Sequence, residues 1–176
     1  MFNNPLFRIV IRYGLISGLI GFVLLAILYY IGRHPFVIPV FFDFRILLFS
    51  FVLVFSLRDF RDFHNEGLLS FAQGMMGGFV LTFCYALVSS VLLFFFAGWN
   101  NVFLSSFIEL TLEQAKSYPT EDIERMGRAT FEQGLKAISD ADAAYLAKRY
   151  FFQSFIISFF ISIVISVILR RQPKTL

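Results

Sequence analysis

The stretch YFFQSFIISFFISIVISVIL, from Tyr150 to Leu169, decides the fold class of this chain. It contains no charged side chain, and a membrane-spanning helix needs about 20 predominantly apolar residues. Serine recurs at every fourth position within it, at Ser154, Ser158, Ser162 and Ser166. Residues four apart share one face of a helix, and small side chains on one face let two helices approach closely in a bilayer. The stretch therefore predicts a membrane helix, over about 144–170, that packs tightly against another helix.

A second series of small residues occupies an earlier apolar segment, Leu68–Phe96. Its members are Ser70, Gly74, Gly78, Thr82, Ala86 and Ser90. Ser70 also begins a capping-box pattern with Gln73, so the packing series is firm only from Gly74 onward. Gly14 and Gly18, four apart in the first apolar segment, are assigned the same packing role. The last two membrane helices are therefore expected to meet each other closely, or each to meet a helix of a partner, and the drift of a four-residue spacing favours right-handed crossings of about −40°.

The composition indicates a membrane protein independently of any motif. Hydrophobic residues make up 58% and charged residues 15% of the 176 residues, and the mean hydropathy is +0.75. A soluble domain carries about 25% charged residues, and 26 phenylalanines are too many for a surface exposed to water. The single cysteine, Cys84, lies in an apolar segment, which excludes an intrachain disulfide framework and favours a buried, unreactive side chain.

Four apolar segments predict an all-α protein with a single membrane domain over residues 1–176. The expected membrane helices cover about 9–32, 41–60, 68–97 and 144–170. The second is the weakest, because its uninterrupted part, Ile46–Leu57, is too short to cross alone and the crossing must include Asp43. The first has the basic flank of a signal peptide, but it is too long and lacks a small-residue cleavage site. We therefore expect it to be retained as an anchor.

Basic residues near the segment ends predict the orientation of these helices. Four crossings place three basic groups on one side of the membrane: Arg8 and Arg12, Arg58 and Arg61, and Arg170, Arg171 and Lys174. Cytoplasmic loops carry the excess of arginine and lysine, so both termini are expected in the cytoplasm. The long third loop carries more acidic than basic residues, which fits its translocation to the other side.

That third loop, about 100–140, predicts a small extracytoplasmic cap of two helices. Ser106 and Glu109 form a capping-box pattern, Pro119 ends the first helix, and Thr120 is expected to cap the second. Apolar residues at helical spacing give the second helix an apolar stripe. They are Ile123, Met126, Phe131, Leu135 and Ile138. The stripe is expected to pack on the outer ends of the crossings, to lie on the membrane surface or to bind a partner protein, and Ser139 or Asp140 is expected to begin the last helix.

Charged residues at the membrane boundaries are further candidates for contact. Residues 58–63 read RDFRDF, which fits an interfacial turn, with Arg58 and Arg61 as candidate contacts for a partner or a lipid head group. Asp43 and Arg45 lie near the outer end of the second crossing, and ionisable residues inside a membrane raise a functional hypothesis by default. They fit a structural pair as well as a small transporter or a lipid-handling site. That alternative uses four boundary charges: Asp43, Arg45, Arg61 and Arg149.

No enzyme or metal pattern occurs in the sequence. His64 and Glu66 are two candidate ligands without a third, which is a weak metal signal. A glycine-rich phosphate loop and the Gly-x-Ser-x-Gly nucleophile motif are both missing. We therefore expect no catalytic residue, no cofactor, no metal, no nucleic acid and no small-molecule substrate.

The order of these features resembles a bacterial family of four-helix membrane proteins, common in Bacteroidetes, catalogued as domain of unknown function forty-one ninety-nine. The resemblance rests on YGLISG at residues 13–18, Arg61 with NEGLLSFAQG at residues 65–74, the helical outer loop, and Ile161–Leu169 followed by two arginines. It covers essentially the whole chain. It implies a multi-pass protein of the bacterial inner membrane and brings no activity with it.

Together these features favour a non-catalytic subunit, an accessory or scaffold protein of an envelope complex. It is expected to contact lipid and to associate with another integral membrane protein or with its own copies. The expected contacts are the small-residue helix faces and the cap residues Ile123, Met126 and Phe131.

Overall fold

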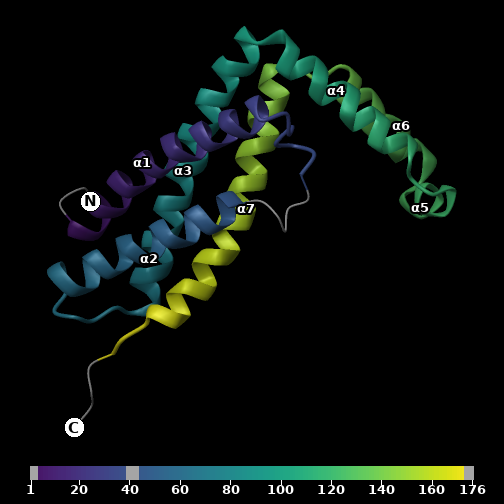
Figure 1. Cartoon of the computed structure of the whole chain (residues 1–176). Coiled ribbons are helices and arrows are strands. Elements are labelled where there is room, and N and C mark those ends of the chain that lie inside the picture. Colours follow the sequence, from purple (N-terminus) through teal and green to yellow (C-terminus); the bar gives the residue numbers. More distant parts are fainter. Residues whose placement is uncertain (1–3, 39–43, 173–176) are drawn as a thin grey trace.

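The computed structural model describes residues 4–38 and 44–172, and the predicted all-helical fold is confirmed for this part of the chain (Figure 1). Four long helices pack into a bundle. They are α1 (Pro5–Tyr30), α2 (Phe44–His64), α3 (Phe71–Trp99) and α7 (Ala143–Leu169). Three shorter helices form an arm that extends away from the bundle (Figure 1). They are α4 (Asn101–Lys116), α5 (Thr120–Met126) and α6 (Arg128–Ser139). Two residues with predicted roles, Asp43 and Lys174, lie outside the described residues.

Three of the bundle helices, α1, α3 and α7, are long and apolar enough to cross a membrane. Their most apolar windows have mean hydropathies of 2.1, 2.4 and 2.4. The 21 residues of α2 also suffice in length, but Arg45 and the charged turns from Arg58 onward leave only Ile46–Leu57 uninterrupted. The fourth crossing therefore stays a prediction.

The first turns of α1 and α3 follow from local sequence. Asn4 caps α1 by accepting a hydrogen bond from the Leu6 N–H at 3.0 Å, and Pro5 occupies a position where a missing N–H costs nothing. The capping box of α3 is confirmed, because the Gln73 N–H donates to Ser70 Oγ at 3.1 Å and the Ser70 N–H donates to Gln73 Oε1 at 2.9 Å. Ser70 therefore has a capping role.

The predicted start of the first loop helix is wrong. α4 begins at Asn101, directly after α3, with the Asn100 side chain accepting from the Phe103 N–H at 3.1 Å. Ser106 lies inside the helix, where its hydroxyl donates to the Phe103 carbonyl. Asparagine caps a helix as well as serine does. The helix therefore begins after Asn100, although the pattern at Ser106 and Glu109 is the more recognisable capping box.

The rest of the loop also differs from the predicted pair of helices. Gly127 has a φ of +85°, a left-handed conformation that glycine adopts readily, and it divides the second predicted helix into α5 and α6. Thr120 is the first residue of α5 and its side chain caps nothing, because Pro119 holds the capping position. Asp142, rather than Ser139 or Asp140, caps α7 by accepting from the Tyr145 N–H at 2.7 Å.

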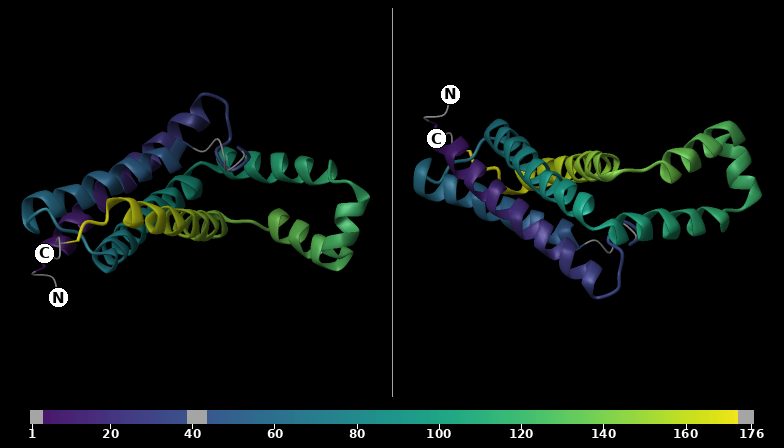
Figure 2. Two further views of the ribbon diagram at one scale, coloured as in Figure 1. Left: turned by 90° about the horizontal axis from the view of Figure 1, so that it is seen from below. Right: turned by 90° about the horizontal axis from the view of Figure 1, so that it is seen from above.

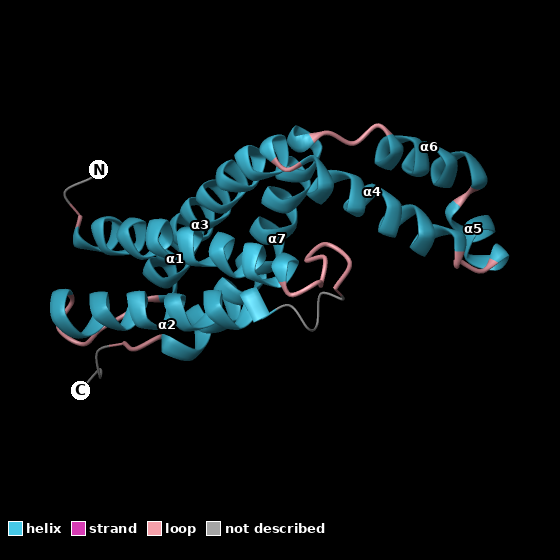
Figure 3. Ribbon diagram, turned by 45° about the horizontal axis from the view of Figure 1, so that its top comes forward, coloured by secondary structure: helices cyan, strands magenta, loops and turns pink. Residues whose placement is uncertain are grey.

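The helix α3 is the centre of the bundle, with its largest contacts to α7 and α1. The start of α1, the end of α2, the start of α3 and the end of α7 lie at one end, here called the tail end (Figures 1 and 2). A two-way backbone bridge closes this end, since the amides of Leu69 and Arg171 each donate to the other's carbonyl at 2.9 and 2.8 Å. The opposite end carries the arm, joined by short connections (Figure 3).

Two apolar clusters fill the molecule, one at each end. The tail-end cluster joins the four bundle helices, with Leu53, Leu57 and Leu81 fully buried. The arm-end cluster joins the base of the arm to α1, α3 and α7, with Phe103 and Phe107 fully buried. Large apolar side chains such as Val23, Phe83 and Phe160 project outward from the bundle, as a lipid-facing surface requires.

Candidate functional site

The two small-residue series meet each other between α3 and α7. A Cβ atom added to Gly74 would lie 2.9 Å from Ser166 Cβ, and one added to Gly78 would lie 2.7 Å from Ser162 Cβ. The Thr82 and Ser162 hydroxyls are 3.3 Å apart and share a hydrogen bond. Such contact leaves no room for a larger side chain, so this pair of faces is occupied within the chain.

The outer members of the two series vary in their surroundings. Three of them are buried: Ala86, Ser90 and Ser158. The Ser158 carbonyl accepts a hydrogen bond from the Ser162 hydroxyl at 2.8 Å. Ser154 is half-buried and borders a small cavity next to α2. The close approach of α3 and α7 is therefore concentrated in the tail-end half of the pair.

A second tight interface joins α1 to α3. A Cβ on Gly14 would lie 2.7 Å from Cys84 Cβ, and one on Gly18 would lie 2.8 Å from Val88 Cβ. The Ser89 hydroxyl donates to the Gly18 carbonyl at 2.8 Å. Gly21 is a further packing residue, which was not predicted: a Cβ added to it would lie 2.9 Å from the Tyr85 ring. Its spacing of three from Gly18 was the available signal.

Arg45 is a buried cation at the arm end of α2. Only 7% of it is exposed, and its guanidinium carbon lies 4.9 Å from the centre of the Tyr150 ring, a cation–π contact. The adjoining cavity, about 20 Å³ in volume, has room for about one water molecule. It is bordered by polar groups of α3 and α7, among them Tyr85, Gln153 and Ser154.

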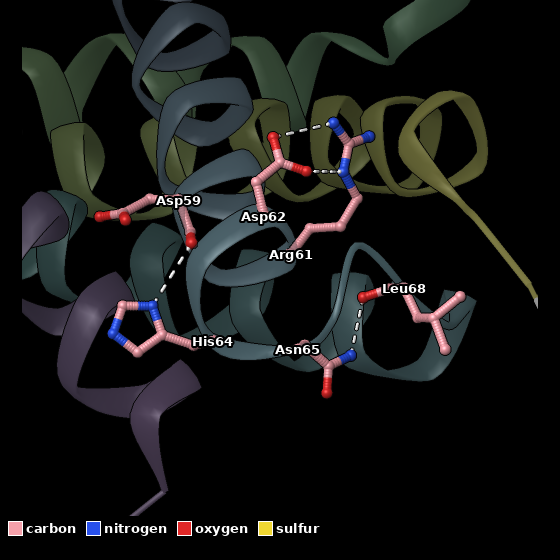
Figure 4. Close-up of polar contacts among 6 residues, drawn as sticks. All are labelled: Asp59, Arg61, Asp62, His64, Asn65 and Leu68. Carbon is pink, nitrogen blue, oxygen red and sulfur yellow. Dashed lines mark hydrogen bonds and ion pairs between the residues drawn. The ribbon is translucent and has the colours of Figure 1, made fainter.

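The other charges of the transporter hypothesis lie elsewhere. Arg149 stacks on the Phe107 ring of the arm, 5.4 Å from its centre. At the tail end, Arg61 pairs with its neighbour Asp62, with Nε 2.7 Å from Oδ1 (Figure 4), and the hydrogen bond from Arg61 lowers the pKa of the Asp62 carboxyl. Arg58 is exposed. The described charges of the transporter hypothesis are thus divided between the two ends of the bundle, with Arg45 and Arg149 at the arm end and Arg61 at the tail end.

The base of the arm is held by an aromatic cluster around His34. The His34 ring stacks on Phe103 at a centre-to-centre distance of 4.8 Å and lies 6.1 Å from Tyr29 and 5.9 Å from Phe107. Its Nδ1 accepts from the Phe36 N–H at 3.4 Å, so Nε2 carries the proton and donates to the Phe103 carbonyl at 3.3 Å. A neutral imidazole satisfies both bonds.

Acidification is expected to loosen this base. Burial lowers the pKa of His34 below its ordinary value, so between the folded and the ordinary pKa the unfolded chain binds more protons than the folded one. Stability then falls as the pH drops through that range, by up to about 1.4 kcal/mol per pH unit. The protection factors of the α4 amides, which correct for the slower intrinsic exchange at low pH, should fall in the wild type between pH 7 and pH 5. His34→Gln should abolish this pH-linked step, and an equal step in the variant would contradict the assignment.

A groove runs between α1 and α2 at the tail end. Its volume is about 560 Å³. Exposed basic side chains border it, with Arg8 and Arg12 on α1 and His64 at the end of α2. Asp59 lies on the α2 side, where its carboxylate faces the Tyr13 phenol. From the sequence, Arg8 and Arg12 were assigned only a role in orientation. The groove itself was not predicted, because it joins residues some fifty positions apart in the chain.

The loop that follows α2 is ordered by its own polar contacts (Figure 4). The Asp59 carbonyl accepts from His64 Nδ1 at 3.4 Å, so that nitrogen carries the proton. The Asn65 side chain donates to the Leu68 carbonyl at 2.7 Å, and Glu66 and Gly67 both adopt positive φ values. These contacts fix the His64 side of the groove.

The outer part of the arm makes little contact with the rest of the chain. Neither α5 nor α6 has a buried residue. Met126 is 48% exposed, while Ile123 and Phe131 are half-buried, the latter with its ring 6.3 Å from Tyr118. Only the base of the arm, at Phe103 and Phe107, belongs to the arm-end cluster.

The described residues contain no group of three or more potential metal ligands. Three long apolar helices, packed through glycine and serine, define a multi-pass helical membrane protein. The chain belongs to the family described as "Protein of unknown function (DUF4199)", whose sequence profile matches residues 12–171. No curated protein and no solved structure matches the chain.

Proposed function

We propose that this protein is a non-catalytic accessory or scaffold subunit of the bacterial inner membrane, and that its arm binds a partner membrane protein. The observation that carries the proposal is the projecting arm, whose outer helices bury no residue and present Met126 with Ile123 and Phe131 beside it. Tyr118 covers Phe131 in part within the arm, and the exposed remainder of an amphipathic apolar side is a common means of recognition between proteins.

The occupied helix interfaces support the arm as the binding surface. The glycine faces of α1 and α3, and the serine face of α7, are filled by other helices of the same chain. A partner helix cannot replace them without taking the bundle apart. The small residues therefore hold the bundle together, and we assign the binding of a partner protein to the arm.

We further propose that α2 crosses the membrane, which places both termini in the cytoplasm. Leu47, Phe51 and Phe55 recur at every fourth position on α2 and are each more than half exposed, as expected for a face in contact with lipid. The other side of α2 packs on α1 and α7. An even number of crossings then keeps Arg8, Arg58 and Arg170 on the side that the positive-inside rule assigns to the cytoplasm.

Site-specific photo-crosslinking in native membranes tests the arm. A photoreactive residue at Met126 should give a discrete crosslinked product, whereas the same residue at Gln133, an exposed polar position on α6, should give none. In a chain without the photoreactive residue, Met126→Glu should weaken copurification of the crosslinked partner about tenfold or more, as loss of an interface hot spot does. Two differently tagged copies of this chain distinguish self-association from another partner. Equal products from positions 126 and 133 would contradict the proposal.

A further inference from the structure

The groove between α1 and α2 has the chemistry of a site for an anionic amphiphile. Arg8 and Arg12 are four residues apart on α1, so both guanidinium groups lie on the same face of the helix, and both border the groove. Both are exposed and, within the described part of the chain, neither forms an ion pair. Their charge is therefore available to a ligand.

Among the described residues that border the groove, the one carboxylate does not cancel this charge. Asp59 supplies a single negative charge against two arginines, and it faces the Tyr13 phenol. His64 adds an imidazole whose Nδ1 is committed to the Asp59 carbonyl. With the proton on Nδ1, Nε2 of the neutral ring is an acceptor, so it can accept a hydrogen bond from a ligand hydroxyl but donates none to a phosphate oxygen.

An apolar track leads from these charges toward the middle of α1. Ile9, Tyr13 and Ile16 border the same groove, and their spacing of four and then three places them on one helix face. Ile16 is 48% exposed. A ligand that fits this arrangement has an anionic head at the tail end of the bundle and a hydrocarbon chain running along the α1–α2 surface.

We infer that this groove binds the phosphate head group of an anionic phospholipid, with Arg8 and Arg12 as its main contacts. Guanidinium groups bind phosphate oxygens with charge-assisted hydrogen bonds, and basic residues beside membrane helices attract anionic lipids. The site does not involve the arm, so it stands independently of the proposed partner.

Native mass spectrometry of the full chain tests the inference. The protein is released from nanodiscs that contain equal amounts of phosphatidylglycerol and phosphatidylcholine, and the lipids that remain bound are counted. The wild type should retain phosphatidylglycerol selectively. The double variant Arg8→Gln/Arg12→Gln should lose about 30-fold in that retention, as expected for two basic residues at an anionic surface.

The matched control removes the same charge from the arm. Arg125→Gln/Arg128→Gln breaks only two long, exposed ion pairs, of 3.9 and 4.0 Å, and should retain lipid like the wild type. Equal retention by the two double variants would overturn the inference. So would displacement of the lipid by millimolar inorganic phosphate, which would indicate a site for free phosphate. A wild type whose selectivity survives a rise from low to high salt would also overturn it, and this measurement does not depend on the variants folding.

Discussion

Replacing Gly78 by leucine is expected to separate α3 from α7 and to destabilise the whole bundle. An alanine Cβ at this position would already lie 2.7 Å from Ser162 Cβ, and α7 cannot retreat without losing the neighbouring Gly74–Ser166 contact. Overpacking a close-packed interior costs about 1–3 kcal/mol, and the leucine side chain should exceed that range. Inside a bilayer the loss is not offset by hydrophobic burial elsewhere, because helix association there depends on packing.

Cys84 provides the measurement for this variant. It is the single cysteine of the chain, and it is half-buried rather than buried as predicted. Its Cβ lies against Gly14 in the α1–α3 interface, so the rate of thiol labelling should rise when SDS opens the bundle in mixed micelles. Gly78→Leu should become fully labelled at a lower SDS fraction than the wild type. Gly78→Ala should shift in the same direction by a smaller amount.

Gly98→Ala is the matched control on the same helix. A Cβ at Gly98 meets only Ala143 Cβ, at 4.0 Å, which is ordinary contact. Alanine is favoured over glycine in a helix by about 1 kcal/mol, so this variant should be as stable as the wild type or more so. If Gly78→Leu and Gly98→Ala opened at the same SDS fraction, the tight α3–α7 interface would be refuted.

The close packing of the bundle helices could be predicted from the sequence because the small residues that allow it recur at a regular spacing. Gly74 and Gly78 on one segment, and Ser162 and Ser166 on another, predict a close helix pair from spacing alone. The choice between an internal and an external partner was not readable, because each series shows only its own face. The structure resolves it by placing Gly78 against Ser162.

The arm and the groove were harder to predict for different physical reasons. Two cap residues, Asn100 and Ser106, compete for one helix start, and propensity alone does not rank them. The groove depends on Arg8 and Arg12 meeting the end of α2, a tertiary contact with no local signature. Arg45 was likewise predicted to lie at the membrane boundary. In the structure it is buried, with its guanidinium over the Tyr150 ring.

These differences bear on how the arm is held. The arm-end cluster is aromatic, and its most central ring is Phe103, which is fully buried and lies 4.9 Å from Tyr29, 4.8 Å from His34 and 5.1 Å from Phe96. The main bundle interfaces do not depend on this ring, since α3 packs on α1 and α7 through Gly18, Gly74 and Gly78. The arm and the bundle can therefore be separated by mutation.

Phe103→Ala is expected to release the arm while the bundle stays closed. Removing a fully buried phenylalanine costs about 3–5 kcal/mol, and this cost is confined to the contacts of α4 with the bundle. Hydrogen exchange of the α4 amides should accelerate strongly, whereas the rate of Cys84 labelling in mild detergent should stay that of the wild type. Val102→Ala, next in sequence but 67% exposed, should change stability by less than about 0.5 kcal/mol. If the α4 amides stayed protected in Phe103→Ala, the Phe103 ring would not be what holds the arm. If Cys84 labelling accelerated as well, the arm and the bundle would form one cooperative unit. Partner binding at the arm would then be coupled to helix packing in the membrane.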